Sequence, residues 1–337
     1  MTDQIGSLII DLQGTELSLE ERELLMHPLI GGVILFSRNY ESRRQLKQLC
    51  QHIRSSRSMP LLIMVDQEGG RVQRFVNEFT RLPAMAMFGE LYDKHPQRAC
   101  ALAQDCGWLM AMELLSVNVD LSLAPVLDLQ RNISQVIGSR AFHAQPQIVV
   151  KLASAFTQGM QNAGMSSTVK HFPGHGSVAL DSHHTIPHDA RSLEELEQQD
   201  MLPFIHMIQH NIAAVMVAHL VFPNVDPASV SFSHYWLHDI LRIKLGFSGV
   251  IFSDDLNMEG ANISVNYEDR VVAAREAGCD FALLCNNRKG VIQALDQLPH
   301  KFYFVHASKW HRLQGKIAEE FSENSQKYLQ IRQTLCL

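Results

Sequence analysis

The 337-residue sequence predicts a single (β/α)8 barrel of the α/β class. Short apolar runs rich in Val, Ile and Leu alternate with longer segments of helical periodicity, eight times in succession. The runs are nearly continuous in hydrophobicity, as parallel strands buried on both faces are. The length suits one barrel with loop insertions, and no proline-rich or low-complexity linker marks a second domain. We therefore expect one domain over residues 1–337, with a helical tail after about residue 300.

The expected strands follow from these runs in chain order. They are Ile5–Leu12, Gly32–Phe36, Leu61–Val65, Val119–Leu127, Ser167–Val169, Ala213–Ala218, Gly249–Phe252 and Asp280–Leu284.

The expected helices lie between and after the strands. Gly246 and Gly278 stand where two of these helices end, as expected at helix C-termini. A doubly wound open sheet is the alternative arrangement of the same elements. The helices are Leu17–Leu25, Ser42–Arg54, Gln97–Leu115, Pro146–Asn162, Leu193–Gln209, Tyr235–Leu245, Tyr267–Ala277 and Lys289–Leu295.

Composition excludes several classes of function. Hydrophobic residues make up 46% and charged residues 19%, which is globular composition, and the net charge is −6 without a Lys/Arg-rich block. We therefore expect no nucleic-acid partner. No apolar run is long enough to cross a membrane, and the acidic N-terminus does not resemble a secretory signal. The six cysteines form no CxxC pair, which favours reduced thiols and the cytoplasm. We expect the protein to be a monomer.

Polar side chains follow almost every apolar run. In a barrel these strand ends share one rim, where active sites are built. The alternative, that all strands end in polar loops, does not explain why the opposite ends are mostly small or apolar. The residues are Asp11, Ser37–Asn39, Asp66–Glu68, Asp128, Lys170–His171, His219, Asp254–Asp255 and Cys285–Asn287.

The segment VDQEGGRVQR begins with the strand-end carboxylate Asp66. Two glycines then allow close backbone approach, and the cations Arg71 and Arg74 follow. Such a segment can bind sugar hydroxyls and an anionic group. A salt-bridged surface loop is an equally good interpretation of this segment alone.

The segment KHFPGHG, with DSHH and His188 behind it, gathers five histidines in one loop. Its histidines could bind zinc, or one of them could be a general acid/base. Lys170 beside His171 disfavours a cation there, and neither HExxH nor HxH stands at a strand end. Asp181 and His183 are two residues apart, so the carboxylate can raise the pKa of the imidazole. For His184 and His188 a surface position without a role is the better interpretation.

The segment GVIFSDDLNM places Asp254 and Asp255 at a strand end. We expect one carboxylate to face the rim as a nucleophile and the other to turn outward to a helix terminus or a cation. A purely structural pair of carboxylates is the alternative.

Taken together, these segments resemble the bacterial β-N-acetylglucosaminidases (β-hexosaminidases) of glycoside hydrolase family 3, of the NagZ type. The matching stretches are VDQEGGRVQRF, IGSRAF, KHFPGHG with DSH behind it, GVIFSDDLNMEGA, AGCD and CNNRKG. They extend from about the first expected strand to the eighth. The sequence departs from the family at Gln13, where relatives often carry an acid, and at Asn257, where Ser is commoner.

The resemblance implies a retaining hydrolase that acts without metal or cofactor. Asp254 would be the nucleophile, and His183 partnered by Asp181 would be the acid/base. A set of residues that hold N-acetylglucosamine would comprise Asp66, Arg74, Arg140, Lys170 and His171. The implied substrate is N-acetylglucosamine β-linked to 1,6-anhydro-N-acetylmuramic acid, with or without stem peptide, in peptidoglycan recycling.

Three rival hypotheses remain open from the residues alone. The histidine loop could serve a metal-dependent barrel hydrolase, the pocket could bind sugar without turnover, or phosphate could replace water as the acceptor. From the residues alone, Asp254 would be paired with another carboxylic acid, because glycoside hydrolysis usually uses two carboxyl groups. A histidine acid instead avoids like-charge repulsion with the nucleophile.

Overall fold

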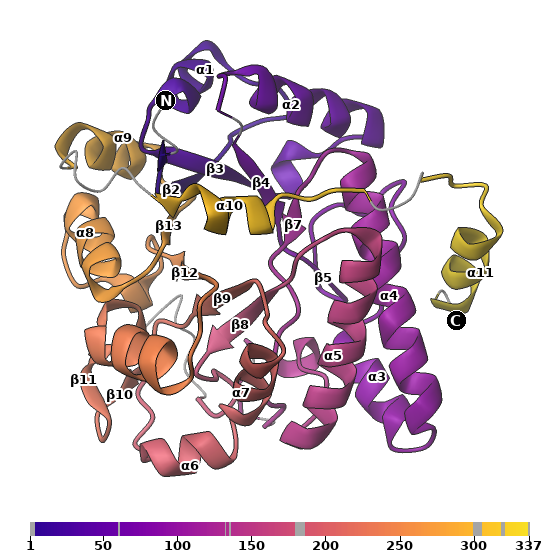
Figure 1. Ribbon diagram of the computed structural model, residues 1–337. Helices are drawn as coiled ribbons and strands as arrows, with labels where there is room; N and C mark the ends of the chain where they lie inside the picture. Colours follow the sequence, from indigo (N-terminus) through magenta and orange to yellow (C-terminus); the bar gives the residue numbers. More distant parts are fainter. Residues whose placement is uncertain are drawn as a thin grey trace.

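The computed structural model describes residues 4–59, 61–131, 133–134, 136–178, 186–298, 305–317 and 321–335. Eight parallel strands form its central sheet, and helices surround the strands on the outside (Figure 1). The order of the strands in the sheet is β7-β4-β3-β2-β13-β12-β9-β8. Their bounds are β2 Leu8–Asp11, β3 Ile30–Leu35, β4 Leu62–Val65, β7 Leu121–Ser122, β8 Thr168–Phe172, β9 Ala214–Val217, β12 Val250–Asp255 and β13 Phe281–Leu284.

The two ends of this sheet meet, so the sheet is closed. The chain after β7 runs beside β8, where the Leu127 N–H donates to the carbonyl of Lys170 at 2.7 Å and Thr168 N–H donates to that of Ala124 at 3.0 Å. Val126 and Lys170 form a parallel bridge. Pro125 lacks an N–H, which is why the regular strand β7 is shorter than the apolar run predicts. The predicted (β/α)8 barrel is confirmed, and the open doubly wound sheet is wrong.

The helices lie where the periodicity predicts them, with one exception. The prediction of one helix over Leu193–Gln209 is wrong, because two helices, α6 and α7, occupy this segment. Pro203 in the first turn of α7 cannot extend a preceding helix. Asp200 in the break is fully buried and pairs with Arg191. The helices are α1 Leu19–Met26, α2 Arg43–Ser55, α4 Pro96–Ser116, α5 Pro146–Ala163, α6 Leu193–Gln198, α7 Leu202–Gln209, η4 Tyr235–Lys244 (a π-helix), α8 Tyr267–Ala277 and α9 Arg288–Gln297.

Several short elements are additions that the periodicity does not predict. They are β1 Gln4–Ile5, η1 Ser37–Asn39, β5 Gln67–Gly69, β6 Val72–Gln73, α3 Met85–Tyr92, η2 Gly138–Arg140, β10 Val221–Phe222, β11 Asp226–Ser229, η3 Val230–Phe232, η5 Glu259–Ala261 and β14 Val305–His306. The helices α10 Ala307–Leu313 and α11 Gln326–Leu335 lie in the tail for which the sequence analysis expects helix.

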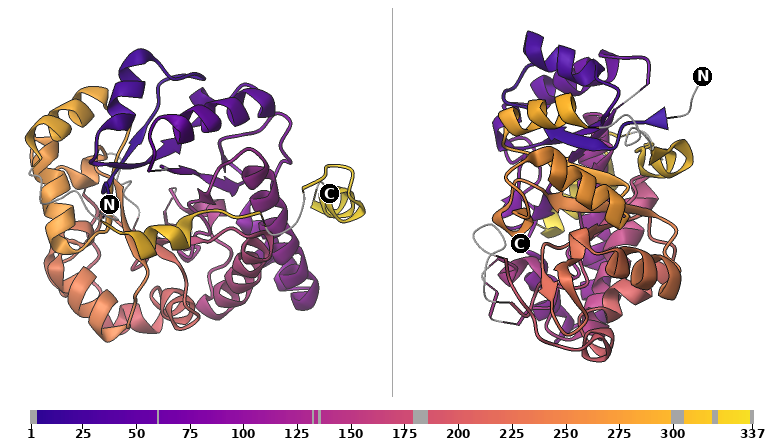
Figure 2. Two further views of the ribbon diagram at one scale, coloured as in Figure 1. Left: turned by 45° about the horizontal axis from the view of Figure 1, so that its top comes forward. Right: turned by 90° about the vertical axis from the view of Figure 1, so that its left-hand side faces the viewer.

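The amino-terminal end of the barrel is covered by α10 (Figures 1 and 2). Lys309 of this helix bonds to Asp280, just before β13, at 2.9 Å, and Ser166, just before β8, donates to the carbonyl of Arg312 at 2.5 Å. The polar groups at the carboxyl ends of the strands therefore remain on the uncovered face. In the described ranges, no helix combines the length and hydropathy that a membrane span needs.

A buried carboxylate connects the helix α11 to the body of the protein. Glu113 of α4 accepts hydrogen bonds from the N–H and hydroxyl of Thr80 and from the Tyr328 hydroxyl, the last at 2.6 Å. Glu113 and Thr80 are each only 1% exposed. Thr80 lies in the segment between β6 and α3, so Glu113 joins three parts of the chain.

Candidate active site

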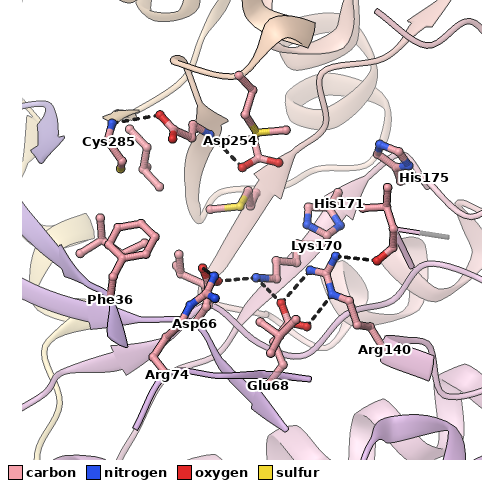
Figure 3. A pocket seen from close by; sticks show the side chains of 18 of the residues that line it. Phe36, Asp66, Glu68, Arg74, Arg140, Lys170, His171, His175, Asp254 and Cys285 are labelled. Carbon is pink, nitrogen blue, oxygen red and sulfur yellow. Dashed lines mark hydrogen bonds and ion pairs between the residues drawn. The ribbon is translucent and has the colours of Figure 1, made fainter. Parts of the chain in front are cut away.

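A cavity of about 760 Å³ lies at the carboxyl ends of the strands (Figure 3). This volume is in the range of small-molecule sites. Six of the eight predicted site residues line it, and they come from different strands and loops, as expected at this face of a barrel. The six are Asp66, Arg74, Arg140, Lys170, His171 and Asp254.

The β5–β6 hairpin brings Arg74 to the cavity. Gly69 and Gly70 at its turn have φ of +108° and +55°, and a Cβ on Gly69 would lie 2.5 Å from the carbonyl oxygen of Pro83. The turn therefore requires glycine. The side chain of Gln67 accepts from the Arg74 N–H at 3.0 Å, which fixes the backbone that carries this arginine.

One side of the cavity is an ion-pair network of Asp66, Glu68, Arg74, Arg140 and Lys170 (Figure 3). Lys170 Nζ lies 2.7 Å from Asp66 Oδ1 and 2.7 Å from Glu68 Oε1. Arg140 donates two parallel hydrogen bonds to Glu68, both of 2.7 Å. Arg74 Nη2 lies 3.3 Å from Asp66 Oδ2. The sequence analysis assigned no role to Glu68, although its place after a strand was the available signal.

The ion-pair network keeps its members charged. Burial alone would raise the pKa of both Asp66 and Glu68. Lys170 and Arg74 instead lower the pKa of Asp66 below its ordinary value. Arg140 and Lys170 do the same for the pKa of Glu68. Burial alone would lower the pKa of Lys170, but Asp66 and Glu68 raise it. Fixed charges of both signs therefore face the cavity, and they can bind hydroxyl and amide groups in a set orientation.

Asp254 and Asp255, called here the β12 pair, stand opposite this network. Burial would raise the pKa of Asp254, but the His171 and His219 imidazoles and the N–H of Asp255 outweigh burial, so its pKa is lowered. The Asp255 N–H lies 2.8 Å from Asp254 Oδ1. Among the described residues, Asp254 has no salt-bridge partner. Its carboxylate is thus ionised and not clamped by a Lys or Arg.

Asp255 corrects one expectation from the sequence. Its carboxylate does not turn outward to a cation or helix terminus; it lines the cavity and accepts the N–H groups of Asn257 at 3.0 Å and Cys285 at 2.9 Å. Burial raises the pKa of Asp255 to about 7, and these two hydrogen bonds only partly oppose the rise. Two adjacent carboxyl groups thus have pKa values displaced in opposite directions.

The buried carboxylate of Asp128 holds His171 in place. Asp128 is fully buried, and its Oδ2 lies 2.7 Å from Nδ1 of His171, while its Oδ1 accepts the His175 N–H at 2.6 Å. The pKa of Asp128 is lowered by His171 despite burial, so the carboxylate is an acceptor and His171 Nδ1 carries the proton. His171 therefore has Nε2 free of Asp128, and its ring lines the cavity. The peptide bond between Lys170 and His171 is cis, and both side chains reach the cavity.

The other two predicted catalytic residues, Asp181 and His183, lie outside the described residues, as does His184. The histidine loop is described up to Val178 and again from Ile186. His188 is exposed, and its segment pairs with β10 through a bridge to Val221. The acid/base assignment to His183 and Asp181 therefore stays a prediction.

The metal hypothesis rests on the histidine loop, of which Asp181, His183 and His184 lie outside the described residues, so it stays untested. Within the described ranges, the histidine, cysteine and acidic side chains close enough to share a metal ion are His234, His238 and Asp239, which are exposed around η4. They do not line the cavity.

Comparison with known proteins identifies the family. The profile of the glycosyl hydrolase family 3 N-terminal domain matches residues 2–306. The chain belongs to glycosyl hydrolase family 3. The predicted resemblance is thereby confirmed.

Individual relatives within family 3 sharpen this result. The chain is 52% identical to the β-hexosaminidase of Tolumonas auensis over 295 residues, 87% of each protein. It is 48% identical to that of Thioalkalivibrio sulfidiphilus over 325 residues, 96% of this chain and 93% of the relative. It also resembles the structure of NagZ from Neisseria gonorrhoeae in complex with N-trifluoroacetyl-D-glucosamine. The TM-score is 0.92 at 40% identity, covering 98% of this chain and 97% of the other.

These likenesses also confirm the predicted enzyme class within family 3. The chain is a glycoside hydrolase of the β-N-acetylhexosaminidase type.

Proposed function

We propose that the chain is a retaining exo-β-N-acetylglucosaminidase. Its substrate would be N-acetylglucosamine linked to 1,6-anhydro-N-acetylmuramic acid, with or without stem peptide, and its role would be peptidoglycan recycling. The single observation that carries the mechanism is Asp254: an ionised carboxylate with a lowered pKa, in a cavity, with no cationic clamp among the described residues. Such a carboxylate has lone pairs available for attack.

In the first step a carboxylate oxygen of Asp254 forms a bond to the anomeric carbon while the bond from that carbon to the leaving oxygen breaks. An acid, which we assign to His183 with Asp181 as its partner, gives its proton to the leaving oxygen. In the second step the neutral imidazole takes a proton from water, whose oxygen displaces Asp254 from the anomeric carbon. Two inversions at this carbon retain the configuration.

The ion-pair network supplies the sugar-binding groups of this mechanism. Its carboxylates and cations are fixed by one another before substrate arrives, so little reorganisation accompanies binding. Asp66, Arg74, Arg140 and Lys170 would contact the hydroxyl and N-acetyl groups of the sugar. His171, held by Asp128, would donate or accept through Nε2.

We place the enzyme in the cytoplasm. The described cysteines are free thiols, and four of the five are buried, which suits a reducing compartment. The proposed substrate is a wall fragment that has been taken up for reuse. Fractionation of cells that express the chain at its natural level tests the location.

Trapping with a fluorinated sugar tests the nucleophile. A fluorinated N-acetylglucosaminide slows both steps, so the glycosyl-enzyme should accumulate and peptide mapping should find the label on Asp254. The matched control is Asp254→Asn, which should take no label while keeping the circular dichroism spectrum of the wild type. A label on any other residue contradicts the assignment.

Leaving-group dependence tests the acid. His183→Ala should lose most activity on substrates with poor leaving groups and least on activated aryl glycosides, which need no proton. Equal loss on every leaving group would contradict the role of His183. The same assays with a chelator and with added phosphate address the metal and phosphate hypotheses, and we expect neither to change the rate.

A further inference from the structure

His219 contacts the β12 pair from outside the cavity. It follows β9, is only 1% exposed and does not line the cavity. Its Nε2 lies 3.1 Å from the carbonyl oxygen of Asp255, and because a carbonyl can only accept, Nε2 carries the hydrogen. Burial lowers the pKa of His219 below its ordinary value, so the imidazole is a neutral donor at pH 7. Its ring stacks on that of Phe232, with centroids 5.9 Å apart and planes 15° from parallel.

Strand β12 leaves the regular ladder where it carries Asp254. Its pairing with β9 ends at Ser253, one residue before Asp254. Toward β13 the register shifts just before Asp255, where three residue steps on β12 are matched by two on β13. An extra residue of this kind interrupts the ladder and changes the direction of the side chains around it. Backbone pairing alone therefore does not fix the direction of Asp254.

Two buried side chains replace the missing ladder bonds. On the side of β13, the Ser253 hydroxyl accepts the N–H of Leu283 at 3.0 Å and donates to the carbonyl of Asp254 at 2.7 Å. On the side of β9, His219 donates to the carbonyl of Asp255, two residues beyond the end of the ladder. The irregular end of β12 is thus held from both neighbouring strands.

We propose that His219 is a positioning residue for catalysis, whose neutral imidazole holds the end of β12 so that Asp254 faces the anomeric carbon. The inference rests on the proposed function, in which Asp254 is the nucleophile. A displacement of a reacting group by about 1 Å can lower a rate on the order of 10²-fold. Because His219 does not line the cavity, loss of its hydrogen bond should slow the attack without weakening sugar binding.

Two amide variants separate the hydrogen bond from the rest of the side chain. In His219→Gln the amide nitrogen can reach the position of Nε2, so a donor to the Asp255 carbonyl is kept. In His219→Asn the shorter side chain cannot reach it. Ser231→Ala is the control, because it deletes another buried donor, to the carbonyl of Ala218 at 2.9 Å, and leaves the bonds of β12 intact.

The measurement is the rate at which a fluorinated N-acetylglucosaminide labels Asp254, as a function of its concentration. We expect His219→Asn to lower the rate constant at saturation by roughly 10- to 100-fold and to change the half-saturating concentration by less than about 3-fold. His219→Gln should stay within about 5-fold of the wild type in both quantities. Ser231→Ala should lower the Tm and keep the wild-type rate of labelling. His219→Leu fills the space beside Phe232 without a donor, and it should show the same loss as His219→Asn if that variant does not fold.

The failures of the two proposals are distinguishable. If the wild type is labelled on Asp254 and the Asn and Leu variants are labelled as fast, the positioning role is wrong and the proposed function stands. Equal loss in His219→Gln or in Ser231→Ala would mean that His219 supports only the packing of this region, which also overturns the role. If the wild type takes no label on Asp254, the assignment of the nucleophile is wrong and the role of His219 is wrong with it.

Discussion

The ion-pair network and the β12 pair face the same cavity but balance their charge in different ways. In the ion-pair network each carboxylate lies within 3.3 Å of cationic nitrogens. These cations lower the carboxylate pKa values by more than burial raises them. In the β12 pair the partners are imidazoles and backbone N–H groups, and the two acids diverge: the pKa of Asp254 is lowered and that of Asp255 is raised.

This difference indicates which carboxylates can react and which can only bind. A carboxylate held by Lys170 or Arg140 is a weak nucleophile, because its lone pairs are engaged, but it is a rigid hydrogen-bond acceptor for a sugar. Asp254 is ionised without such engagement. The contrast leads to four predictions, given in order of decreasing expected effect.

Asp254→Asn should have the largest effect. Loss of the proposed nucleophile should lower kcat by at least about 10⁴-fold, as losses of covalent catalytic groups do. Asp255→Asn is the matched control, because it is the same change one residue along the strand, and it should retain measurable turnover. Steady-state kinetics on an aryl β-N-acetylglucosaminide decides between them. Comparable inactivation of both variants would erase the distinction drawn within the β12 pair.

Glu68→Gln should have the largest effect on stability. It leaves Lys170 and Arg140 buried with one acceptor charge fewer, and breaking a buried pair in this way typically lowers the free energy of unfolding by about 3–5 kcal/mol. The control is Glu323→Gln, whose partner is Arg43 and whose side chain is 58% exposed. It should change the free energy of unfolding by less than about 1 kcal/mol. Denaturant titration measures the free energy of unfolding of both variants. Equal losses would contradict the claim that the buried ion pairs of Glu68 contribute more to stability than the exposed pair of Glu323.

Asp128→Asn should have an intermediate effect on catalysis. Without the carboxylate, His171 loses its anchored tautomer, and kcat/KM should fall by roughly 10- to 100-fold, equivalent to one hydrogen bond to a charged group. The pH profile should change as well. Asp120→Asn is the control, because Asp120 is equally buried at the opposite end of β7 and accepts the N–H of Ile63 at 2.9 Å. That variant should lose stability and keep the wild-type pH profile.

The pH dependence of stability should give the smallest effect. Because the pKa of Asp255 is raised to about 7 in the folded protein, protonated Asp255 favours folding at low pH, and this contribution is lost as pH rises from about 4 to 7. Asp255→Asn removes the titration. The free energy of unfolding of the wild type relative to this variant should therefore fall between pH 4 and 7.5, by on the order of 1–3 kcal/mol given its partial exposure. A constant difference in the free energy of unfolding across this range would mean that the pKa of the Asp255 carboxyl group is not raised.

The fold could be predicted because strand burial on both faces leaves a direct trace in the sequence. Each of the eight apolar runs contains or overlaps a strand of the barrel. Periodicity did not reveal the break between α6 and α7, although Pro203 was a signal for it in the sequence. The buried ion pair of Asp200 with Arg191 in this break depends on the assembled fold. The short helix α3 was missed because its eight residues include Gly89 and show little periodicity.

The site was predictable in its membership more than in its electrostatics. Strand-end position pointed to Asp66, Lys170, His171 and Asp254. The same rule placed Glu68 and Asp128 on the rim, although the sequence analysis assigned them no role. The state of Asp255 had no local signal, because its raised pKa comes from burial in the assembled rim, which the N–H groups of Asn257 and Cys285 only partly oppose. Charge balance is a property of the assembled rim and is absent from any one segment.

The hydrogen bond between Tyr328 and Glu113 connects α11, at the outside of the molecule, to the segment that carries Arg74. The carboxylate of Glu113 accepts a hydrogen bond from Thr80, in the segment that follows Arg74. The same carboxylate accepts a hydrogen bond from Tyr328 of α11. Burial and Glu113 raise the pKa of Tyr328 to about 12. The phenol therefore keeps its proton in alkaline buffer and remains a hydrogen-bond donor to Glu113. A surface replacement in α11 can thus alter the support of Arg74, which we propose binds the sugar, and we expect such a replacement to weaken substrate affinity from outside the cavity.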